Sequence, residues 1–499
     1  MAANEWSCYI ARTVHFLLAY SILNHDELLY LTAHETRLLF QSGELSPVDL
    51  MQAMIERSEA VEPQVNAFCD RYFDEAMSRA RKAEKRYVTP AVQPGPLEGI
   101  PVAIKDDTAI QGKRSCAGSL FLRDHVDGQT HPSVERLIHS GAIVHARTTC
   151  PEFCWTWVTA TRLNGVTRNP WNLYYSPGGS SGGSAAALAA GSTMLATGTD
   201  SAGSIRQPAA LCGIVGFKPP HGRNPQSPDV SFDVYNHIGP MARSVQDCLL
   251  MQNVMAGPHP LDPHCVRPKM RIPENPGEVS GMRIAYSMDL GCYTVSSDVR
   301  RETRGALDRL EEAGARIEAV ETPWAADAIE ISGHYGDHLY SDDFDDAVSR
   351  YPDLVCEYTP WFAGQIRRIT RKQVHDAHRL AGRIWNDHFG PLLNEFDVFI
   401  CPTTTSNNLP ADLLPWESVT VNGRKLSPDE TALTILFNLY SRCPVLSVPA
   451  GFTRAGMPVG IQIVGSPYND VPVFRVGSAL ERSASWFQSK NGLPDFKSR

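Results

Sequence analysis

The sequence lacks an excess of positive charge. Its 46 lysine and arginine residues are outnumbered by 55 aspartate and glutamate residues, which gives a formal net charge of −9. A chain with this balance has no basic field that would attract a phosphate backbone. We therefore expect no nucleic-acid partner.

Metal-binding patterns are lacking as well. The chain has 12 cysteines, but Cys150 and Cys154 stand four apart without a second pair or a histidine pattern to complete a zinc site. The 16 histidines form no H-E-x-x-H motif, and there is no phosphate-binding P-loop. We expect no metal, no cofactor, and free thiols in a reducing, cytoplasmic compartment.

The apolar run at residues 14–23 is too short to span a bilayer. It resembles a signal-peptide core, but Arg12 is the one basic residue nearby, Glu5 lies before it and no A-x-A cleavage site follows. A packed helix or an upstream start codon explains the run better than export does. We therefore expect residues 1–27 to form a helical N-terminal extension, and the protein to have no membrane partner.

Two dense glycine and serine turns, GGSSGG at 178–183 and SAGS at 201–204, lie near the middle of the sequence. A flexible linker would have a similar composition. However, residues 185–190 have high helix propensity, and apolar segments follow at 194–197 and 214–217. The two turns are therefore predicted to belong to an ordered part of the chain.

These turns are suited to acyl transfer. Their four serines and five glycines bury little apolar surface, so packing alone does not explain them. Glycines let the backbone approach a ligand closely, and runs of backbone N–H groups bind anions. A nucleophilic serine beside such N–H groups is the arrangement that acyl transfer needs.

Strand and helix patterns alternate along the chain. A strand is expected over 101–104, a short helix over 133–139 and a strand over 142–146, and late strands are expected at 398–401 and 460–464. No repeat or low-complexity segment divides the sequence. We expect one α/β domain built on a large mixed sheet.

Three parts of the chain resemble the amidase signature family of serine hydrolases. They are the glycine- and serine-rich block at 176–208, PVAIKDD at 101–107, and a C-terminal run from CPTTT at 401–405 to PVGIQIVG at 458–465. The resemblance extends from about residue 28 to 487.

The resemblance carries expectations about the fold. It implies one amidase signature domain over residues 28–499, with a twisted mixed sheet covered by helices on both sides. Residues at about 322–395 would be its variable, helical substrate cover. Relatives are often dimers, so a homodimer is compatible with it.

By the same resemblance, Ser204 is the nucleophile, Ser180 the proton relay and Lys105 the terminal base. Ser204 follows Ser180 by 24 residues, as in the family, and a cis peptide bond is expected at Gly179–Ser180. A lysine accepts a proton when it is neutral, which requires a pKa lowered from about 10.4 to near 7–8. A lysine whose stem merely covers a strand end is the alternative for Lys105.

The backbone N–H groups of Ser201, Ala202, Gly203 and Ser204 would form the oxyanion hole. Many family members have glycine where this chain has Ala202, which keeps the N–H group and adds one methyl group. Three more residues are expected to support the site: Ser181, Asp200 and Arg206. Ser181 is either a helper of the reaction or the cap of the helix that follows it.

By position, Cys154, Trp155 and Trp157 fall in the loop that lines the acyl pocket in relatives. Tryptophans also pack simply in cores, which is the alternative for both of them. Aromatic walls without a fixed cation would favour a small neutral substrate, apolar or aryl-bearing.

The leading hypothesis is an amidohydrolase that cleaves the C–N bond of a linear amide through an acyl-enzyme. Carbamate (urethane) or aryl ester hydrolysis by the same residues is the first alternative. The glutamine-hydrolysing component of a tRNA-dependent amidotransferase is the second, although its own run of small residues and tyrosine is absent after Lys218-Pro219-Pro220. A non-catalytic scaffold is the third, and intact Lys105, Ser180 and Ser204 argue against it.

Overall fold

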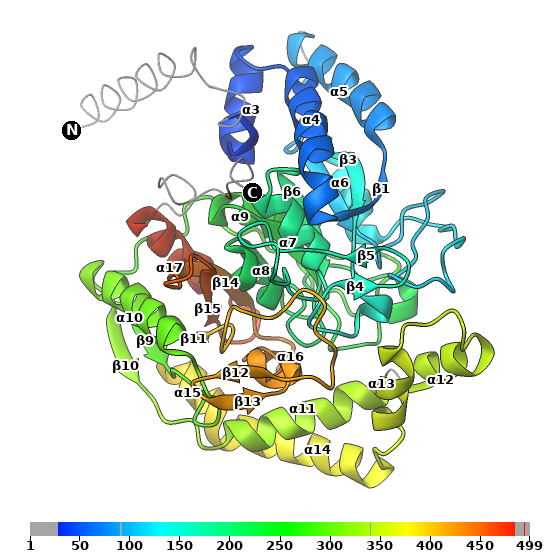
Figure 1. Cartoon of the computed structure of the whole chain (residues 1–499). Coiled ribbons are helices and arrows are strands. Elements are labelled where there is room, and N and C mark those ends of the chain that lie inside the picture. Colours follow the sequence, from blue (N-terminus) through cyan, green and yellow to red (C-terminus); the bar gives the residue numbers. More distant parts are fainter. Residues whose placement is uncertain (1–27, 90–91, 340, 485–493, 495–499) are drawn as a thin grey trace.

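The structure is a computed structural model that describes residues 28–89, 92–339, 341–484 and 494 (Figure 1). The N-terminal extension expected at residues 1–27 lies outside the described residues. Within them, no helix is both long and apolar enough to cross a membrane.

One mixed sheet of eleven strands runs through the described part of the chain. Strand β2 pairs in parallel with β3 and β6, whereas β6 pairs antiparallel with β8. This confirms the predicted single α/β domain with a large mixed sheet. The strands, in spatial order, are β1 (Phe68–Arg71), β3 (Ile143–Thr148), β2 (Pro101–Lys105), β6 (Leu195–Thr199), β8 (Ile238–Ala242), β7 (Val215–Lys218), β14 (Val445–Phe452), β15 (Pro458–Val464), β11 (Val398–Pro402), β9 (Arg283–Tyr286) and β10 (Arg316–Ala319).

Helices pack on both faces of this sheet. On one face lie α7 (Gly182–Ala189) and α8 (Arg206–Cys212), and on the other lies α9 (Val245–Met255). The remaining helices on the body of the domain are α3 (Ala33–Ser42), α4 (Pro47–Val65), α5 (Phe73–Val88), α6 (Pro132–His139), α10 (Ser297–Glu312), α16 (Leu436–Leu439) and α17 (Asp470–Ser483).

Successive side chains of β2 divide between these two faces, because side chains alternate along a strand. Val102 and Ile104 belong to the core cluster that contains α9, and Ala103 belongs to the cluster that contains α7 and α8. Helix α7 consists of small residues, and all of its residues are buried. Lys105, two residues after Ala103, therefore points toward the face that carries α7.

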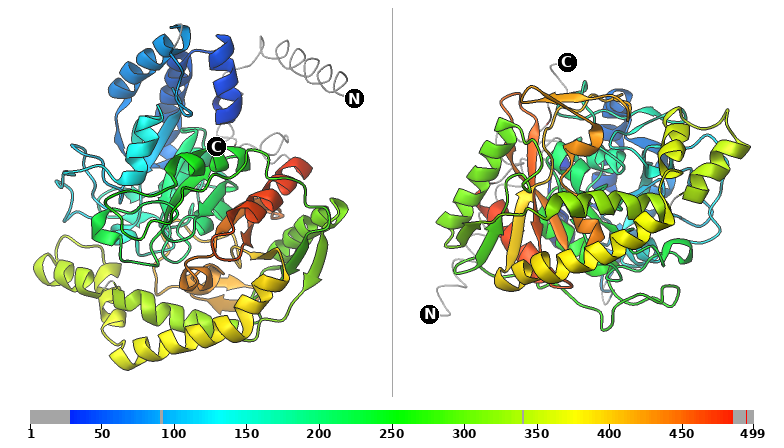
Figure 2. Two further views of the ribbon diagram at one scale, coloured as in Figure 1. Left: turned by 180° about the vertical axis from the view of Figure 1, so that it is seen from behind. Right: turned by 90° about the horizontal axis from the view of Figure 1, so that it is seen from below.

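A group of helices lies over one end of the sheet (Figures 1 and 2). Helices α11 and α14 run side by side, and α12 and α13 extend from them along one edge of the molecule. Their bounds are α11 (Ala325–Leu339), α12 (Ser341–Arg350), α13 (Tyr358–Ile366) and α14 (Arg371–Ile384), followed by a π-helical turn at Trp385–Phe389 and α15 (Gly390–Glu395). Two short hairpins, β4 (Ala160–Thr161) with β5 (Gly165–Val166) and β12 (Val419–Val421) with β13 (Arg424–Leu426), and three 3₁₀ turns, η1 (Glu152–Cys154), η2 (Pro228–Val230) and η4 (Pro428–Thr431), complete the described elements.

Candidate active site

Lys105 ends strand β2 and is fully buried. Its Nζ donates a hydrogen bond of 2.7 Å to Ser180 Oγ and another of 2.6 Å to Thr199 Oγ1. Ser180 lies in the turn before α7, and Thr199 is the last residue of β6. The structure therefore brings two of the three predicted catalytic residues, Lys105 and Ser180, into direct contact.

The turn before α7 approaches other backbone segments closely. The peptide bond between Gly179 and Ser180 is cis, as predicted. A Cβ atom at Gly179 would lie 2.2 Å from the carbonyl oxygen of Thr156, so glycine is required at this position. Ser181 makes no side-chain cap to α7. Instead its Oγ donates a hydrogen bond of 3.3 Å to the Thr199 carbonyl oxygen. Of the two roles considered for Ser181, side-chain capping of α7 is therefore wrong.

Ser204 lies in the turn between β6 and α8. The Ser181 N–H donates 3.1 Å to the Ser204 carbonyl oxygen, so the two glycine- and serine-rich turns are joined through their backbones. No hydrogen bond joins the described side chains of Ser180 and Ser204. Catalytic hydrogen bonds are often long in ligand-free enzymes and shorten when substrate binds.

The predicted oxyanion hole lies in the same turn. Gly203 has φ 135°, a conformation that favours glycine. Within the described part of the chain, no hydrogen bond uses the N–H groups of Ala202, Gly203 or Ser204, and Ala202 and Ser204 line the cavity described below. Thr434 Oγ1 donates 2.6 Å to the Ala202 carbonyl oxygen and holds the turn from outside.

Asp200 and Arg206 form a fully buried ion pair directly behind this turn. Arg206 Nε donates a hydrogen bond of 3.0 Å to Asp200 Oδ2, and Arg206 Nη2 donates another of 3.0 Å to Asp200 Oδ1. Asn438 Nδ2 donates to the same carboxylate. Burial opposes ionisation of Asp200, but the charge and hydrogen bonds of Arg206 hold the pKa of this carboxyl well below its usual range. The pair therefore supports the turn as a fixed, ionised brace.

Asp107 is a site residue that sequence reasoning missed. Its Oδ2 lies 3.0 Å from Lys105 Nζ and accepts hydrogen bonds from Thr199 Oγ1 over 2.5 Å and from Cys154 Sγ over 3.3 Å. Asp107 and Thr199 thus complete the surroundings of the lysine ammonium group, together with Ser180.

This carboxylate overturns the expected pKa of Lys105. Burial by itself lowers the pKa of the lysine, but the neighbouring charge of Asp107 outweighs it, and the pKa lies above its ordinary value. Asp107 therefore favours the protonated form of Lys105, and the neutral form that accepts a proton becomes more abundant as the pH rises. The sequence expectation of a pKa near 7–8 considered burial without this partner.

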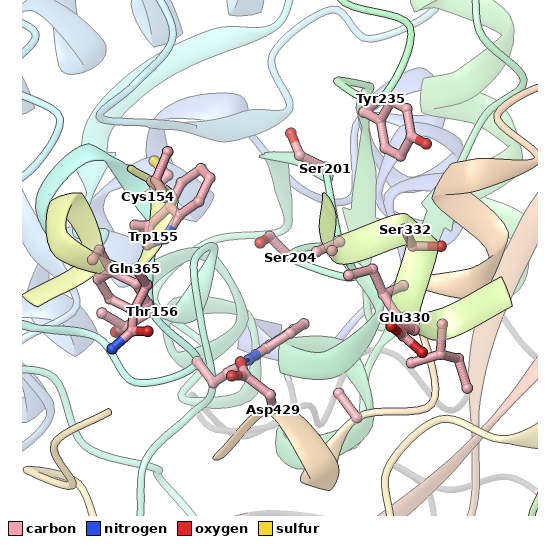
Figure 3. A pocket seen from close by; sticks show the side chains of 18 of the residues that line it. Cys154, Trp155, Thr156, Ser201, Ser204, Tyr235, Glu330, Ser332, Gln365 and Asp429 are labelled. Carbon is pink, nitrogen blue, oxygen red and sulfur yellow. Dashed lines mark hydrogen bonds between the residues drawn. The ribbon is translucent and has the colours of Figure 1, made fainter. Parts of the chain in front are cut away.

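Ser204 lines a cavity of about 390 Å³ (Figure 3). The three predicted substrate-binding residues, Cys154, Trp155 and Trp157, line the same cavity. Cys154 has φ 62°, a left-handed conformation that is uncommon for a residue with a side chain. The loop at 154–157 therefore forms part of the cavity wall, as predicted.

A second cavity of about 460 Å³ meets the first at Ser204. Ser180, Thr199 and Asp107 line this second cavity, together with His131. Burial lowers the pKa of His131 to about 4, so this imidazole is neutral at physiological pH. Ser204 therefore has space on two sides, which a substrate with groups on both sides of a scissile bond requires.

Most of the aromatic wall of the first cavity comes from segments without a recognisable motif. Apart from the two predicted tryptophans, the aromatic residues in the wall are Tyr235, Tyr293, Trp361 and Phe362. They come from a loop before β8, a loop before α10, and helix α13. No local spacing in the sequence signals that these distant residues meet.

Comparisons with known proteins agree with this geometry. A family model described as "Amidase" matches residues 49–474. The chain is 33% identical over 480 residues to an acylamidase from Rhodococcus erythropolis, with 94% of this chain and 98% of that protein covered. It is 32% identical over 504 residues to the A component of a glutamyl-tRNA(Gln) amidotransferase from a Roseiflexus species, with 93% and 98% covered.

Solved structures show the same likeness. A bacterial aryl acylamidase of the amidase signature family superposes with a TM-score of 0.85 at 26% identity, over 92% of this chain and 97% of that one. A 6-aminohexanoate cyclic dimer hydrolase complexed with substrate gives a TM-score of 0.81 at 26% identity, over 94% and 100%. The chain therefore belongs to the amidase signature family, and it is a hydrolase of carbon–nitrogen bonds.

Proposed function

We propose that this protein hydrolyses an aryl or apolar linear amide through an acyl-enzyme on Ser204. One observation carries the proposal: the Ser204 side chain lies in the wall of an aromatic cavity, beside backbone N–H groups that no described hydrogen bond uses. Cavities with apolar and aromatic walls bind ligands of the same character.

The reaction follows from the arrangement of the side chains. Ser204 Oγ attacks the amide carbonyl carbon, and its proton passes to Ser180, whose own proton passes to a neutral Lys105. The N–H groups of Ala202 and Gly203 stabilise the oxyanion of the tetrahedral intermediate. The intermediate collapses as the C–N bond breaks, and the relay returns a proton to the departing amine. Water then attacks the acyl-enzyme carbonyl carbon as its proton passes into the same relay, and the ester C–O bond breaks as Ser204 Oγ takes a proton back and the carboxylic acid leaves.

The proposal is tested by amine release from a panel of aliphatic amides, anilides, aryl carbamates and glutamine. We expect wild type to cleave anilides or apolar amides, Ser204→Ala to be inactive, and the exposed-site control Ser42→Ala to keep wild-type activity. A fluorophosphonate should label wild type and Ser42→Ala but not Ser204→Ala. Cleavage by Ser204→Ala at the wild-type rate would refute the assignment.

The relatives favour one further candidate, glutamine hydrolysis for an amidotransferase, because the A component of that enzyme is 32% identical to this chain. The same panel separates the candidates. Selective ammonia release from glutamine, increased by the other components of an amidotransferase, would support this second function.

Preferential cleavage of aryl carbamates would identify the carbamate alternative, which passes through the same tetrahedral oxyanion.

A further inference from the structure

Two carboxylates lie in the aromatic cavity next to Ser204. Glu330 comes from α11 and Asp429 from η4, and in Figure 3 both lie below Ser204 in the view. Among the described residues that line this cavity, none is a lysine, an arginine or a histidine. Every charged side chain that lines the cavity is therefore negative.

Asp429 is held in place by the cavity wall. Its Oδ1 accepts a hydrogen bond of 2.6 Å from Trp157 Nε1. The Asp429 side chain is exposed on the cavity side, and the protein packed around it raises its pKa. No described lysine, arginine or histidine forms an ion pair with it. A carboxylate without a cationic partner attracts a positively charged group that binds beside it.

The capping of η4 does not use Asp429. Acidic residues often cap or stabilise the first turn of a helix. In η4 this role belongs to Ser427 and Glu430, whose side chains form a complete capping box. Asp429 is thus free of the capping interactions and faces the cavity.

Glu330 also has no ion-pair partner among the described residues. It is an exposed residue of α11, and a partner of opposite charge four residues away could pair with it on the helix surface. The residue at that spacing, His334, forms no ion pair with it in the described structure. Glu330 therefore adds a second uncompensated negative charge to the cavity.

The aromatic walls complement these charges. Six aromatic side chains contribute faces or edges to the cavity: Trp155, Trp157, Tyr235, Tyr293, Trp361 and Phe362. An ammonium group near the face of an aromatic ring is stabilised by the charge distribution of the ring, and tryptophan is the best partner. Aromatic rings and carboxylates together are suited to an organic cation rather than to a metal ion.

We propose that this cavity binds a positively charged organic group, an alkyl- or arylammonium carried by the amide substrate, between the aromatic walls and the carboxylates of Glu330 and Asp429. The proposal rests on the proposed amide hydrolysis at Ser204, and it narrows the substrate class. Neutral apolar amides still bind through the aromatic walls, a cation adds affinity, and an anionic group on the same side is repelled. This proposal extends the substrate class beyond the small neutral amides expected from the sequence.

Binding is tested first without catalysis, on the full chain. The probe is (3-hydroxyphenyl)trimethylammonium and its uncharged isostere is 3-tert-butylphenol, each measured by calorimetry and by protection of Ser204 from a fluorophosphonate. We expect wild type to bind the cation at least tenfold more tightly than the isostere. Glu330→Gln/Asp429→Asn should lose this preference and keep its affinity for the isostere.

A matched control separates the cavity from the general charge of the protein. Glu44→Gln/Glu59→Gln removes two exposed carboxylates from the surface near α3 and α4, so its net charge changes by the same amount. We expect this control to keep the wild-type preference. Equal affinity of wild type for the two probes would overturn the proposal, and so would an equal loss of preference in the control.

Kinetics then separate failure of this proposal from failure of the proposed function. Two isosteric pairs place the charge on either side of the scissile bond: 4-(trimethylammonio)butananilide against 5,5-dimethylhexananilide, and the acetamides of 3-(trimethylammonio)propylamine and 4,4-dimethylpentylamine. A preference in kcat/KM for the cation of one pair, lost in Glu330→Gln/Asp429→Asn, supports the proposal. Cleavage of the neutral members without any preference refutes it while amide hydrolysis stands. No cleavage of any amide refutes the proposed function, and the binding arm then decides on the cavity.

Discussion

The ammonium nitrogen of Lys105 lies 3.0 Å from a carboxylate oxygen of Asp107, and the hydroxyl of Thr199 bonds to both groups. The predicted base therefore has an anionic partner in addition to the serine that it serves. Since a base accepts a proton when it is neutral, this ion pair determines the pH range in which the relay works.

Replacing Asp107 by Asn should extend activity to lower pH. The Asp107 charge raises the pKa of Lys105 against the effect of burial, so wild-type kcat/KM should rise with pH into the alkaline range. Without that charge, burial remains and the pKa falls, so that neutral lysine is present at lower pH. We expect the acid limb of the pH profile to move down by about 1–3 pH units, the usual effect of a nearby opposite charge. An unchanged profile would show that Lys105 is not the titrating base.

Removal of the lysine should lower activity at neutral pH, whereas removal of the Asp107 charge should raise it there. We expect Lys105→Ala to lose about 10²–10⁴-fold in kcat/KM at neutral pH, the usual contribution of a general base. Part of the activity should return in alkali, where hydroxide accepts the proton from the serines. The measurement is a pH profile of amine release, with circular dichroism to confirm that the variant is folded. A fully active Lys105→Ala enzyme would exclude the proposed triad.

The Thr199 hydroxyl should matter for positioning rather than for proton transfer. Thr199→Val keeps the shape of the side chain and removes the bridge between Lys105 and Asp107. We expect roughly tenfold lower kcat, a shifted pH profile and a loss of about 1 kcal/mol in the free energy of unfolding. Thr197→Val is the control, because Thr197 Oγ1 bonds the backbone N–H of Lys105 and not its ammonium group. Equal pH profiles in wild type and Thr199→Val would remove Thr199 from this network.

The sequence could predict the site wherever one short segment specifies it. Lys105 at the end of a strand, the cis bond before Ser180 and the turn at Ser204 are all encoded within the segments 101–107 and 176–208. In contrast, the KDD run does not reveal which aspartate folds onto the lysine. Asp106 accepts the backbone N–H groups of Cys116 and Gly118, and Asp107 takes the position beside Lys105.

The substrate cavity could not be predicted for a related reason. Glu330, Trp361 and Asp429 come from segments far apart in the chain, and they meet because α11, α13 and η4 pack over the same end of the sheet. No local sequence pattern around any of the three points to a shared cavity. Their position around one cavity depends on packing between elements, which a local pattern does not contain.

The turn at Gly203 should not accept a side chain. A Cβ atom there would lie 2.0 Å from Thr434 Oγ1 and 2.5 Å from Thr434 Cβ, and the positive φ is unfavourable for alanine. We expect Gly203→Ala to lose at least 10²-fold in kcat, about the cost of removing one oxyanion donor. Gly112→Ala is the control, because Gly112 also has a positive φ, 76°, but no atom within 4 Å of the added carbon. Equal effects of the two substitutions would show that strain, and not the contact with Thr434, is responsible.

The buried brace of Asp200 and Arg206 should be far more costly to break than an exposed ion pair. Either Asp200→Asn or Arg206→Met leaves the other charge buried without its partner, which costs about 3–5 kcal/mol of stability. The double variant should lose less than the sum of the two singles, because it leaves no unpaired charge.

Chemical denaturation of the four proteins of this cycle checks the expectation, with Arg304 and Asp308 as the matched exposed pair. Each single change in that pair should cost about 0–1 kcal/mol. Because the pKa of Asp200 is lowered on folding, its contribution is complete above the pKa of an unfolded aspartate, about 3.9, and is lost only as the pH falls through the folded value. The difference between wild type and Asp200→Asn should therefore stay constant between about pH 5 and 8. A cost for Asp200→Asn no larger than that for Asp308→Asn would show that the turn holding Ser204 does not depend on this brace.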